Sequence, residues 1–269
     1  PLILNGDNVL GKSVTGSGKT FAFAIPCLEQ ALQNKKTIVI SPTRELAVQL
    51  EKEFRKLAKY TKIKSTVVYG GHGMFLEVKK LKEDVHIVCG TPGRVLDHLM
   101  NKNIKKNYFD TLVLDEADRL LDMGFLGEVK SIIEKVNPKR IHLFSATLDN
   151  KIVKLIKSHL KTYKEVSAKV KELKNISEEK IVLRNSEKYP KLLEIVKANI
   201  DARIMIFVAT KKSAETIKNK LDKQGFFVNS IHGDKTQKFR ETALNDFKSK
   251  KVPILIATDV ASRGLHIDD

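Results

Sequence analysis

The stretch Ser13-Val14-Thr15-Gly16-Ser17-Gly18-Lys19-Thr20, followed by Phe21-Ala22-Phe23-Ala24-Ile25, decides the fold. A short apolar run precedes it, so the pattern predicts a strand, a glycine-rich loop and a helix. Glycines allow backbone N–H groups to face a chain of phosphates, and the helix N-terminus adds positive potential. The stretch matches the phosphate-loop pattern GxxxxGK[ST] except at its first glycine, where Ser13 stands. We therefore predict a nucleotide-binding loop.

Each side chain of this loop has an expected role. Lys19 is expected to reach the outer phosphates, and the Thr20 hydroxyl is expected to bind Mg²⁺. The alternative is a glycine turn without a ligand. The predicted ATP-binding residues are Thr15, Gly16, Ser17, Gly18, Lys19 and Thr20.

A second motif places carboxylates at the end of an apolar strand. Residues 111–114 (TLVL) run directly into Asp115-Glu116-Ala117-Asp118. Ligands of parallel sheets gather at the carboxyl ends of the strands, so this position is suited to a metal and a nucleotide. Asp115 is the candidate Mg²⁺ partner, partly through water, and Glu116 is the candidate base or orienting group for the attacking water. The alternative is a solvated acidic cap on the following helix. Lys19, Asp115 and Glu116 form the predicted catalytic set.

Composition limits the class of protein. The 269 residues exceed a usual single domain, and 42% of them are hydrophobic, enough for globular cores. The net charge of +17 favours polyanionic partners such as nucleic acid, although a lysine-rich soluble surface explains it as well. Cys27 and Cys89 lie among apolar residues and are interpreted as buried thiols, which excludes a disulfide framework. We expect an intracellular protein, nuclear or cytoplasmic, without a membrane span.

Strands and helices are expected to alternate in both halves of the chain. Short β-branched runs separated by amphipathic stretches predict an α/β fold with parallel sheets. In the first half, strands are expected at 37–40, 66–69, 85–88, 111–114 and 140–144. In the second half, they are expected at 181–184, 204–208, 227–231 and 254–257, with helices at 189–200 and 211–224.

Between the halves, residues 163–179 are charged and weakly periodic. We interpret this segment as an interdomain linker; an ordinary surface helix is the alternative. The predicted division is a first domain over 1–165, a linker over 166–179 and a partial second domain over 180–269.

The tetrapeptide Asp115-Glu116-Ala117-Asp118 resembles the signature of DEAD-box ATP-dependent RNA helicases of superfamily 2, and other segments follow in that family's order. In the first half these are Pro42-Thr43-Arg44-Glu45-Leu46, Tyr69-Gly70-Gly71, Thr91-Pro92-Gly93-Arg94 and Ser145-Ala146-Thr147. In the second half they are residues 206–210 (IFVAT), 232–234 (HGD), Thr236, Gln237, Arg240 and 257–264 (ATDVASRG). The second half is most similar to the branch that includes the p68 helicase.

The resemblance implies two RecA-like parallel-sheet domains in tandem, the second truncated, that close over ATP and RNA. It implies a monomeric core that binds single-stranded RNA and unwinds short RNA duplexes; protein partners stay unknown. Asp118 is expected to hydrogen-bond Ser145 and Thr147 and so couple hydrolysis to strand separation. The residues implied to contact the RNA backbone are Pro42, Thr43, Arg44, Gly71, Thr91, Gly93, Arg94, Gly233, Asp234 and Thr258. These are small residues, hydroxyls and arginines, which suit phosphate rather than base edges.

Three departures from the family pattern affect the expected activity. The chain starts at Pro1, after the expected place of the adenine-recognising glutamine motif, and ends before the His-Arg-x-Gly-Arg motif. We therefore expect it to begin inside a longer protein and to hydrolyse ATP poorly alone. His266 stands where the family usually has an aspartate that meets the ATP ribose.

Three other classes of protein are weighed against this one. A non-catalytic RNA-binding scaffold is disfavoured by the intact Lys19, Asp115, Glu116 and 145–147 motif. A DNA helicase or chromatin motor is disfavoured by the Asp-Glu-Ala-Asp tetrapeptide and the compact motif spacing. A small-molecule kinase is disfavoured by the second domain and the net charge.

Overall fold

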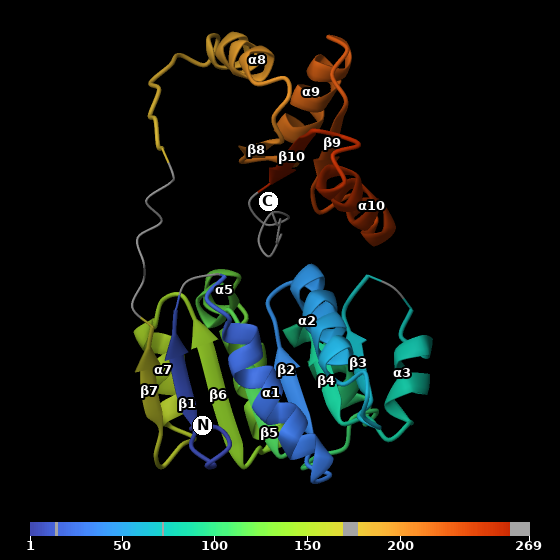
Figure 1. The fold of residues 1–269 in the computed structure, drawn as a ribbon, viewed down its shortest axis with the longest axis vertical. Helices are drawn as coiled ribbons and strands as arrows, with labels where there is room; N and C mark the ends of the chain where they lie inside the picture. The colour runs from blue at the N-terminus through green and yellow to red at the C-terminus, as the bar shows by residue number, and fades with distance from the viewer. Residues whose placement is uncertain (14–15, 72, 169–176, 259–269) are drawn as a thin grey trace. The chain divides into compact units, whose positions relative to one another are not determined.

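The structure is a computed structural model that describes residues 1–13, 16–71, 73–168 and 177–258. The chain divides into two compact units, Pro1–Glu172 and Leu173–Asp269 (Figure 1). Both are α/β units built on parallel sheets, as the sequence predicts.

The first unit is built on a seven-stranded sheet with the order β3-β4-β2-β5-β6-β1-β7, in which every pair of neighbours is parallel. Short runs of β-branched and aliphatic residues form its inner strands because both faces of these strands are covered. The strands are β1 (Val9–Lys12), β2 (Thr37–Ile40), β3 (Ser65–Val68), β4 (Ile87–Gly90), β5 (Thr111–Leu114), β6 (Arg140–Ser145) and β7 (Lys164–Ser167).

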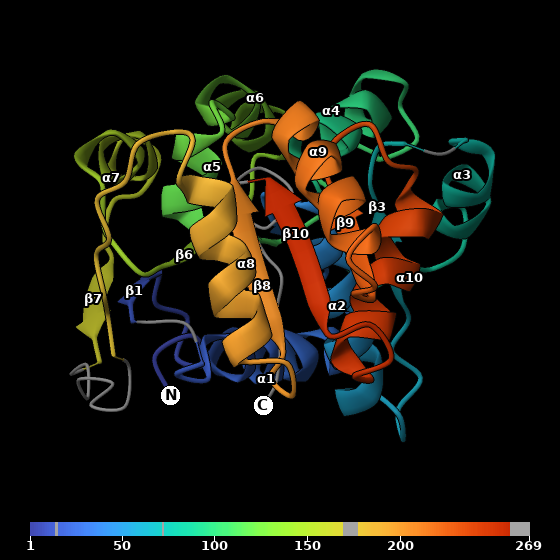
Figure 2. The same ribbon diagram turned by 90° about the horizontal axis from the view of Figure 1, so that it is seen from above.

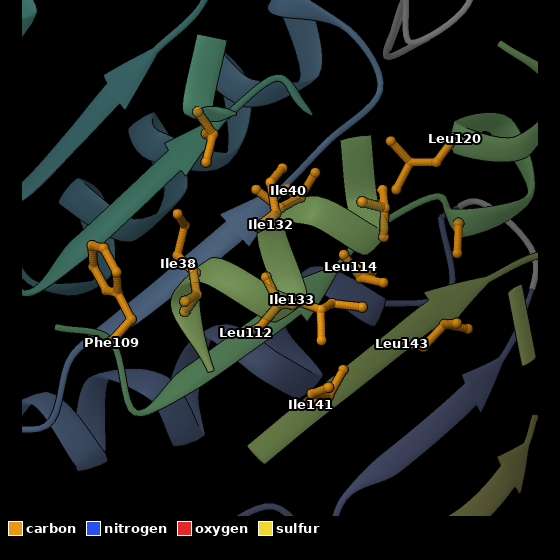
Figure 3. Close-up of a cluster of buried hydrophobic side chains, with 14 of the residues drawn as sticks. Ile38, Ile40, Phe109, Leu112, Leu114, Leu120, Ile132, Ile133, Ile141 and Leu143 are labelled. Atoms are coloured by element: carbon orange, nitrogen blue, oxygen red, sulfur yellow. The ribbon is translucent and has the colours of Figure 1, made fainter. Parts of the chain in front are cut away.

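Helices cover both faces of this sheet. They are α1 (Lys19–Leu32), α2 (Arg44–Leu57), α3 (Phe75–Leu81), α4 (Pro92–Met100), α5 (Ala117–Asp122), α6 (Leu126–Val136) and α7 (Asn150–Lys157). Alternate residues of each strand point to opposite faces: Ile38 and Ile40 pack with α4 to α7, whereas Val39 packs with α1 and α2. Figure 2 shows the two helical layers, and Figure 3 shows side chains of β2, β5 and β6 beneath α5 and α6.

The second unit has the described strand order β8-β10-β9, again parallel. The strands are β8 (Ile204–Val208), β9 (Val228–Ile231) and β10 (Ile254–Thr258). The helices are α8 (Lys188–Ala198), α9 (Lys211–Asp222) and α10 (Gln237–Lys248). Side chains of α8 and α9 pack on one face of the sheet, and Ala243 and Phe247 of α10 pack on the other.

Two sequence predictions near the junction are wrong. Ile181 to Arg184 form no strand, so the described part of the second sheet has three strands rather than about four. Conversely, the predicted linker begins too early, because β7 extends to Ser167 and pairs with β1. The sequence KEVS carries no apolar pattern because all four residues are exposed at the sheet edge. The composition of residues 164–167 therefore does not predict a strand.

The two cysteines of the chain lie inside the first unit. Cys27 and Cys89 are free thiols, fully buried among the side chains that α1 and α2 cover. Burial raises the pKa of Cys27 to about 12 and that of Cys89 well above its usual range. Within the described residues, every helix is too short or too polar to span a bilayer.

Candidate nucleotide and RNA site

The predicted motifs of the first unit gather at one edge because each follows the carboxyl end of a parallel strand. The glycine loop follows β1, residues 42–44 follow β2, and residues 69–71 follow β3. Residues 91–94 follow β4, Asp115 and Glu116 follow β5, and residues 145–147 include and follow the end of β6. The sheet thus brings the sequence-predicted residues of this unit together.

The glycine loop opens directly into α1. Gly16 and Gly18 have φ angles of 78° and 86°, in the left-handed region that favours glycine. Gly18 caps α1 at its N-terminus, and the first turn of the helix carries no acidic residue. Its first N–H groups therefore face the loop without a competing negative charge, as a phosphate site requires. Thr15 lies outside the described residues, and Gly16, Ser17 and Gly18 are exposed.

The rest of the loop is held in place by hydrogen bonds. Ser13 N–H donates to Ser145 O at 3.0 Å, which joins the loop to β6. Lys19 Nζ donates to Ser13 O at 2.6 Å, and Lys19 and Thr20 are half-buried. Burial lowers the pKa of Lys19, although Asp115, Glu116 and Asp118 oppose that shift. Lys19 therefore lies within electrostatic reach of all three carboxylates.

Asp115 is a buried carboxylate at the end of β5. Asp115 is 6% exposed, and its backbone N–H donates a hydrogen bond to Ile40 O at 2.9 Å. Burial, followed by repulsion from Glu116, raises the pKa of Asp115 to about 7. An ionised carboxylate in this position gains from a cation.

Glu116 has a strained backbone, with φ at 48° in the left-handed region. Its Oε2 forms an ion pair with Arg119 Nη1 at 3.0 Å. Burial raises the pKa of Glu116 despite the attraction of Arg119. A carboxylate with a raised pKa is a better proton acceptor than an ordinary one, which suits a base.

Asp118 joins the ends of β5 and β6. Its N–H donates to Ser145 Oγ at 3.0 Å. Its Oδ2 accepts from Thr147 N–H at 3.0 Å and from Thr147 Oγ1 at 3.1 Å. These are the partners that the sequence assigned to Asp118.

The segment after β2 combines a helix cap with a packed arginine. Pro42 and Thr43 are buried, and Thr43 Oγ1 caps α2 by accepting from Leu46 N–H at 3.3 Å. The Arg44 guanidinium lies against Gly71, in the space that a side chain at Gly71 would fill. Gly71 has a φ of 98°, a conformation that favours glycine.

The segment after β4 begins α4. Thr91 N–H donates to Val68 O at 3.1 Å, and Gly93 is exposed at the second position of the helix. Arg94 Nη1 forms an ion pair with Glu77 Oε2 at 2.8 Å, and the Arg94 side chain is 10% exposed. Sequence reasoning missed Glu77, because a single acidic residue in FLEVKKL carries no burial signal.

The second unit holds three predicted RNA residues. Asp234 forms an ion pair with Lys211 Nζ at 2.5 Å, and Gly233 lies beside the same lysine. Thr258 is buried at the end of β10, where it pairs with Val208. The nearby Glu215 was not predicted. Burial raises its pKa, but hydrogen bonds from Ser230, His232 and Lys235 outweigh this and hold the pKa at about 2. Residues 259–269, including His266, lie outside the described residues.

Within the described residues, no three His, Cys, Asp or Glu side chains converge as a metal site.

Comparison with known families covers nearly the whole chain. The DEAD/DEAH box helicase family matches residues 1–156, and the helicase conserved C-terminal domain matches residues 187–269. The probable ATP-dependent RNA helicase of Methanocaldococcus jannaschii is 38% identical over 273 residues, which cover 100% of this chain and 73% of that protein. The ATP-dependent RNA helicase CshA of Listeria monocytogenes is 36% identical over 99% of this chain. The chain spans 52% of the length of CshA.

The solved structures agree with these sequence relatives. Saccharomyces cerevisiae Dbp5 bound to RNA and ADP BeF3 aligns with 99% of this chain and 70% of its own, at 29% identity and a TM-score of 0.84. With the phosphate loop, the Asp-Glu-Ala-Asp strand end and both domain matches in place, the chain belongs to the DEAD-box family of helicases.

Proposed function

We propose that the protein is an RNA-stimulated ATPase that unwinds short RNA duplexes. The observation that carries this proposal is the Asp118 bridge. It ties the strand end that holds Asp115 and Glu116 to the 145–147 segment, beside a phosphate loop on the same sheet edge. The bridge thus joins the predicted nucleotide site to the 145–147 segment, to which the family resemblance assigns the coupling role.

ATP is proposed to bind along the glycine loop. The N–H groups at the start of α1 and the ammonium group of Lys19 would hold its phosphates. Lys19 offsets part of the negative charge of Asp115 and Glu116, so the site does not repel the nucleotide as strongly as two unpaired carboxylates would.

The residues present fit Mg²⁺. The Asp115 carboxyl group is buried beside Glu116, and its pKa is raised to about 7 because its ionised form is destabilised there; a divalent cation would relieve that cost. Asp115 and Thr20 would hold the ion, which supplies charge neutralisation for phosphoryl transfer.

Water activation is assigned to Glu116. Its carboxylate is held by Arg119 and has a raised pKa, so it is prepared to accept a proton from an attacking water. Asp118 would pass the state of the nucleotide site to Ser145 and Thr147.

RNA is proposed to lie across the segments at residues 42–44, 71 and 91–94, with further contacts at 233, 234 and 258 from the second unit. These groups offer backbone N–H groups, hydroxyls and arginines, so recognition is of phosphates and sugars rather than of bases. The relatives named above are RNA helicases, which supports RNA over DNA as the substrate.

Each unit is proposed to be one RecA-like helicase domain, with the connection between them inside residues 168–179 and a monomeric core. The two family matches, which end at 156 and begin at 187, support this division.

The test is steady-state ATP hydrolysis by the full-length protein with and without single-stranded RNA, beside Glu116→Gln. We expect RNA to stimulate turnover and the substitution to lower it by about 10²- to 10⁴-fold, the usual contribution of a general base. Glu134→Gln, on the exposed part of α6, is the matched control and should leave turnover unchanged.

Single-stranded DNA of the same sequence separates the alternatives. Equal stimulation by DNA would contradict the RNA assignment. RNA binding without any hydrolysis would favour the scaffold alternative instead.

A further inference from the structure

Glu77 is a buried carboxylate on a short helix whose other residues are exposed or half-buried. Within α3 (Phe75–Leu81), Glu77 is the buried residue, and its side chain is 4% exposed. A buried charge is costly unless partners compensate it, so its contacts deserve a functional explanation.

The two oxygens of Glu77 reach two different segments. Oε1 accepts a hydrogen bond from Tyr69 N–H at 2.9 Å. Oε2 accepts from Arg94 Nη1 at 2.8 Å and lies 2.8 Å from His98 Nε2. Tyr69 leads into Gly70 and Gly71, whereas Arg94 belongs to the segment at 91–94.

We propose that Glu77 is a positioning residue that fixes the spacing between the two RNA-facing segments at residues 69–71 and 91–94. This inference rests on the proposed function, because both segments are assigned there to the RNA backbone. Glu77 itself is too buried to touch RNA, so it acts through the groups that it holds.

The contacts continue to the third RNA-facing segment. The Arg44 guanidinium lies against Gly71, so residues 42–44, 69–71 and 91–94 are connected through side chains. On the other side, His98 is fully buried, and its Nδ1 lies 3.2 Å from Asn103 Nδ2. The carboxylate is thus held from several directions, and a fixed carboxylate fixes the loops that bind to it.

The spacing of these segments has a direct consequence for binding. Successive phosphates of a bound single strand lie at a regular spacing, so hydrogen bonds to two of them require donors at a fixed separation. The exposed N–H groups near Gly93 depend on the position of α4, which Arg94 and His98 tie to Glu77.

The test compares Glu77→Gln with Glu51→Gln in the full-length protein. A glutamine at 77 keeps one acceptor oxygen and presents an NH₂ group in place of the other, so it can serve one segment but not both. Glu51 is the matched control because it is also buried and bonded to an arginine, Arg55, and to Ser65 Oγ at 2.9 Å. Its contacts join α2 to the start of β3, away from the RNA-facing edge.

We expect Glu77→Gln to raise the RNA concentration for half-maximal ATPase stimulation by about tenfold, within the range typical of coupling between sites. The turnover at saturating RNA and the affinity for a nucleotide analogue without RNA should stay at wild-type values. Glu77→Asp keeps both acceptor oxygens and should fall between the wild type and Glu77→Gln. Glu51→Gln should leave the RNA requirement unchanged.

The outcomes separate the two proposals. Wild-type RNA requirement in Glu77→Gln, or an equal rise in Glu51→Gln, overturns the positioning role alone. Loss of nucleotide binding in Glu77→Gln would mark a general folding defect; the Glu77→Asp variant then decides, and its failure to raise the RNA requirement overturns the role. A wild-type protein that neither binds RNA nor responds to it overturns the proposed function and this inference together.

Discussion

Asp115 is a residue whose burial lowers the stability of the fold when its carboxyl group is ionised. Its carboxyl group is buried at the end of β5 beside another carboxylate, and its pKa is raised to about 7. A group whose pKa is higher in the folded than in the unfolded chain stabilises the fold when protonated. That contribution is complete below the unfolded value of 3.8 and is lost as the pH rises through 7.

Asp115→Asn is therefore expected to stabilise the nucleotide-free protein at pH 8, where the wild type carries a buried charge. The gain has an upper limit of about 4 kcal/mol, from about 1.36 kcal/mol for each unit of pKa shift. At pH 5 the wild-type carboxyl is protonated in the folded chain but still ionised in the unfolded chain, so the gain should fall to about a third of its value at pH 8 and vanish only below pH 3.8. Urea unfolding at both pH values measures it.

The control for this substitution is Asp122→Asn, at an exposed position at the end of α5. It should change the free energy of unfolding little at either pH. An Asp115→Asn variant that is less stable than the wild type at pH 8 would contradict the burial argument.

At the scale of single residues, the hydrogen bonds of Asp118 could be predicted because they follow from residue type and motif spacing. Asp118 was assigned Ser145 and Thr147, and the structure contains these hydrogen bonds. Glu77 and Glu215 were missed because their hydrogen-bond and ion-pair partners come from other elements of the fold, which residue type and spacing do not reveal. The coupling, catalytic and RNA roles stay predictions, as does the p68-like branch.

Among the elements, the inner strands could be predicted and the edges could not. Residues 37–40 and 111–114 are apolar and buried on both faces, so their sequence reveals them. All four residues of the edge strand β7 are exposed, so its sequence resembles that of a linker. Residues 181–184 have a strand-forming composition but form no strand. Strand propensity reflects the packing that a residue finds, which composition does not contain.

The close approach of β4 to its neighbours gives a prediction at this scale. A methyl group added at Gly90 would lie 2.5 Å from Val95 Cγ2 and 2.9 Å from Val68 O. Gly90→Ala should therefore lower the free energy of unfolding by about 1–3 kcal/mol, the usual cost of overpacking. Denaturant unfolding of the first unit measures this change.

Gly93→Ala is the matched control, because a methyl group there meets open space. It should preserve stability, and any weakening of RNA binding in this variant would report on the exposed helix N-terminus alone. Equal destabilisation by the two substitutions would contradict the packing argument.

At the scale of the whole molecule, the two relevant features are the net charge and the order of the two units along the chain. Two parallel α/β units follow each other in the chain, and the net charge is +17. The tandem order was predictable from the recurrence of strand and helix patterns and from the family motifs. The boundary was less accurate because β7 lies in a segment of polar composition.

The charge predicts the salt dependence of RNA binding. If phosphates dominate the contacts, the logarithm of the association constant for single-stranded RNA should fall linearly with the logarithm of salt concentration. The slope should be about −0.7 for each phosphate neutralised. Titrations at several salt concentrations measure it, with an RNA of scrambled sequence as the control. A flat response, or a strong preference for one sequence, would contradict backbone recognition.

The two inaccessible thiols have a practical consequence. Because Cys27 and Cys89 are fully buried with raised pKa values, the folded chain should present almost no thiolate to maleimide reagents. A pair of cysteines introduced at solvent-facing positions, one on each unit, would then take up donor and acceptor dyes without removal of the native ones. Energy transfer between such dyes would follow, molecule by molecule, how the distance between the units responds to nucleotide and RNA.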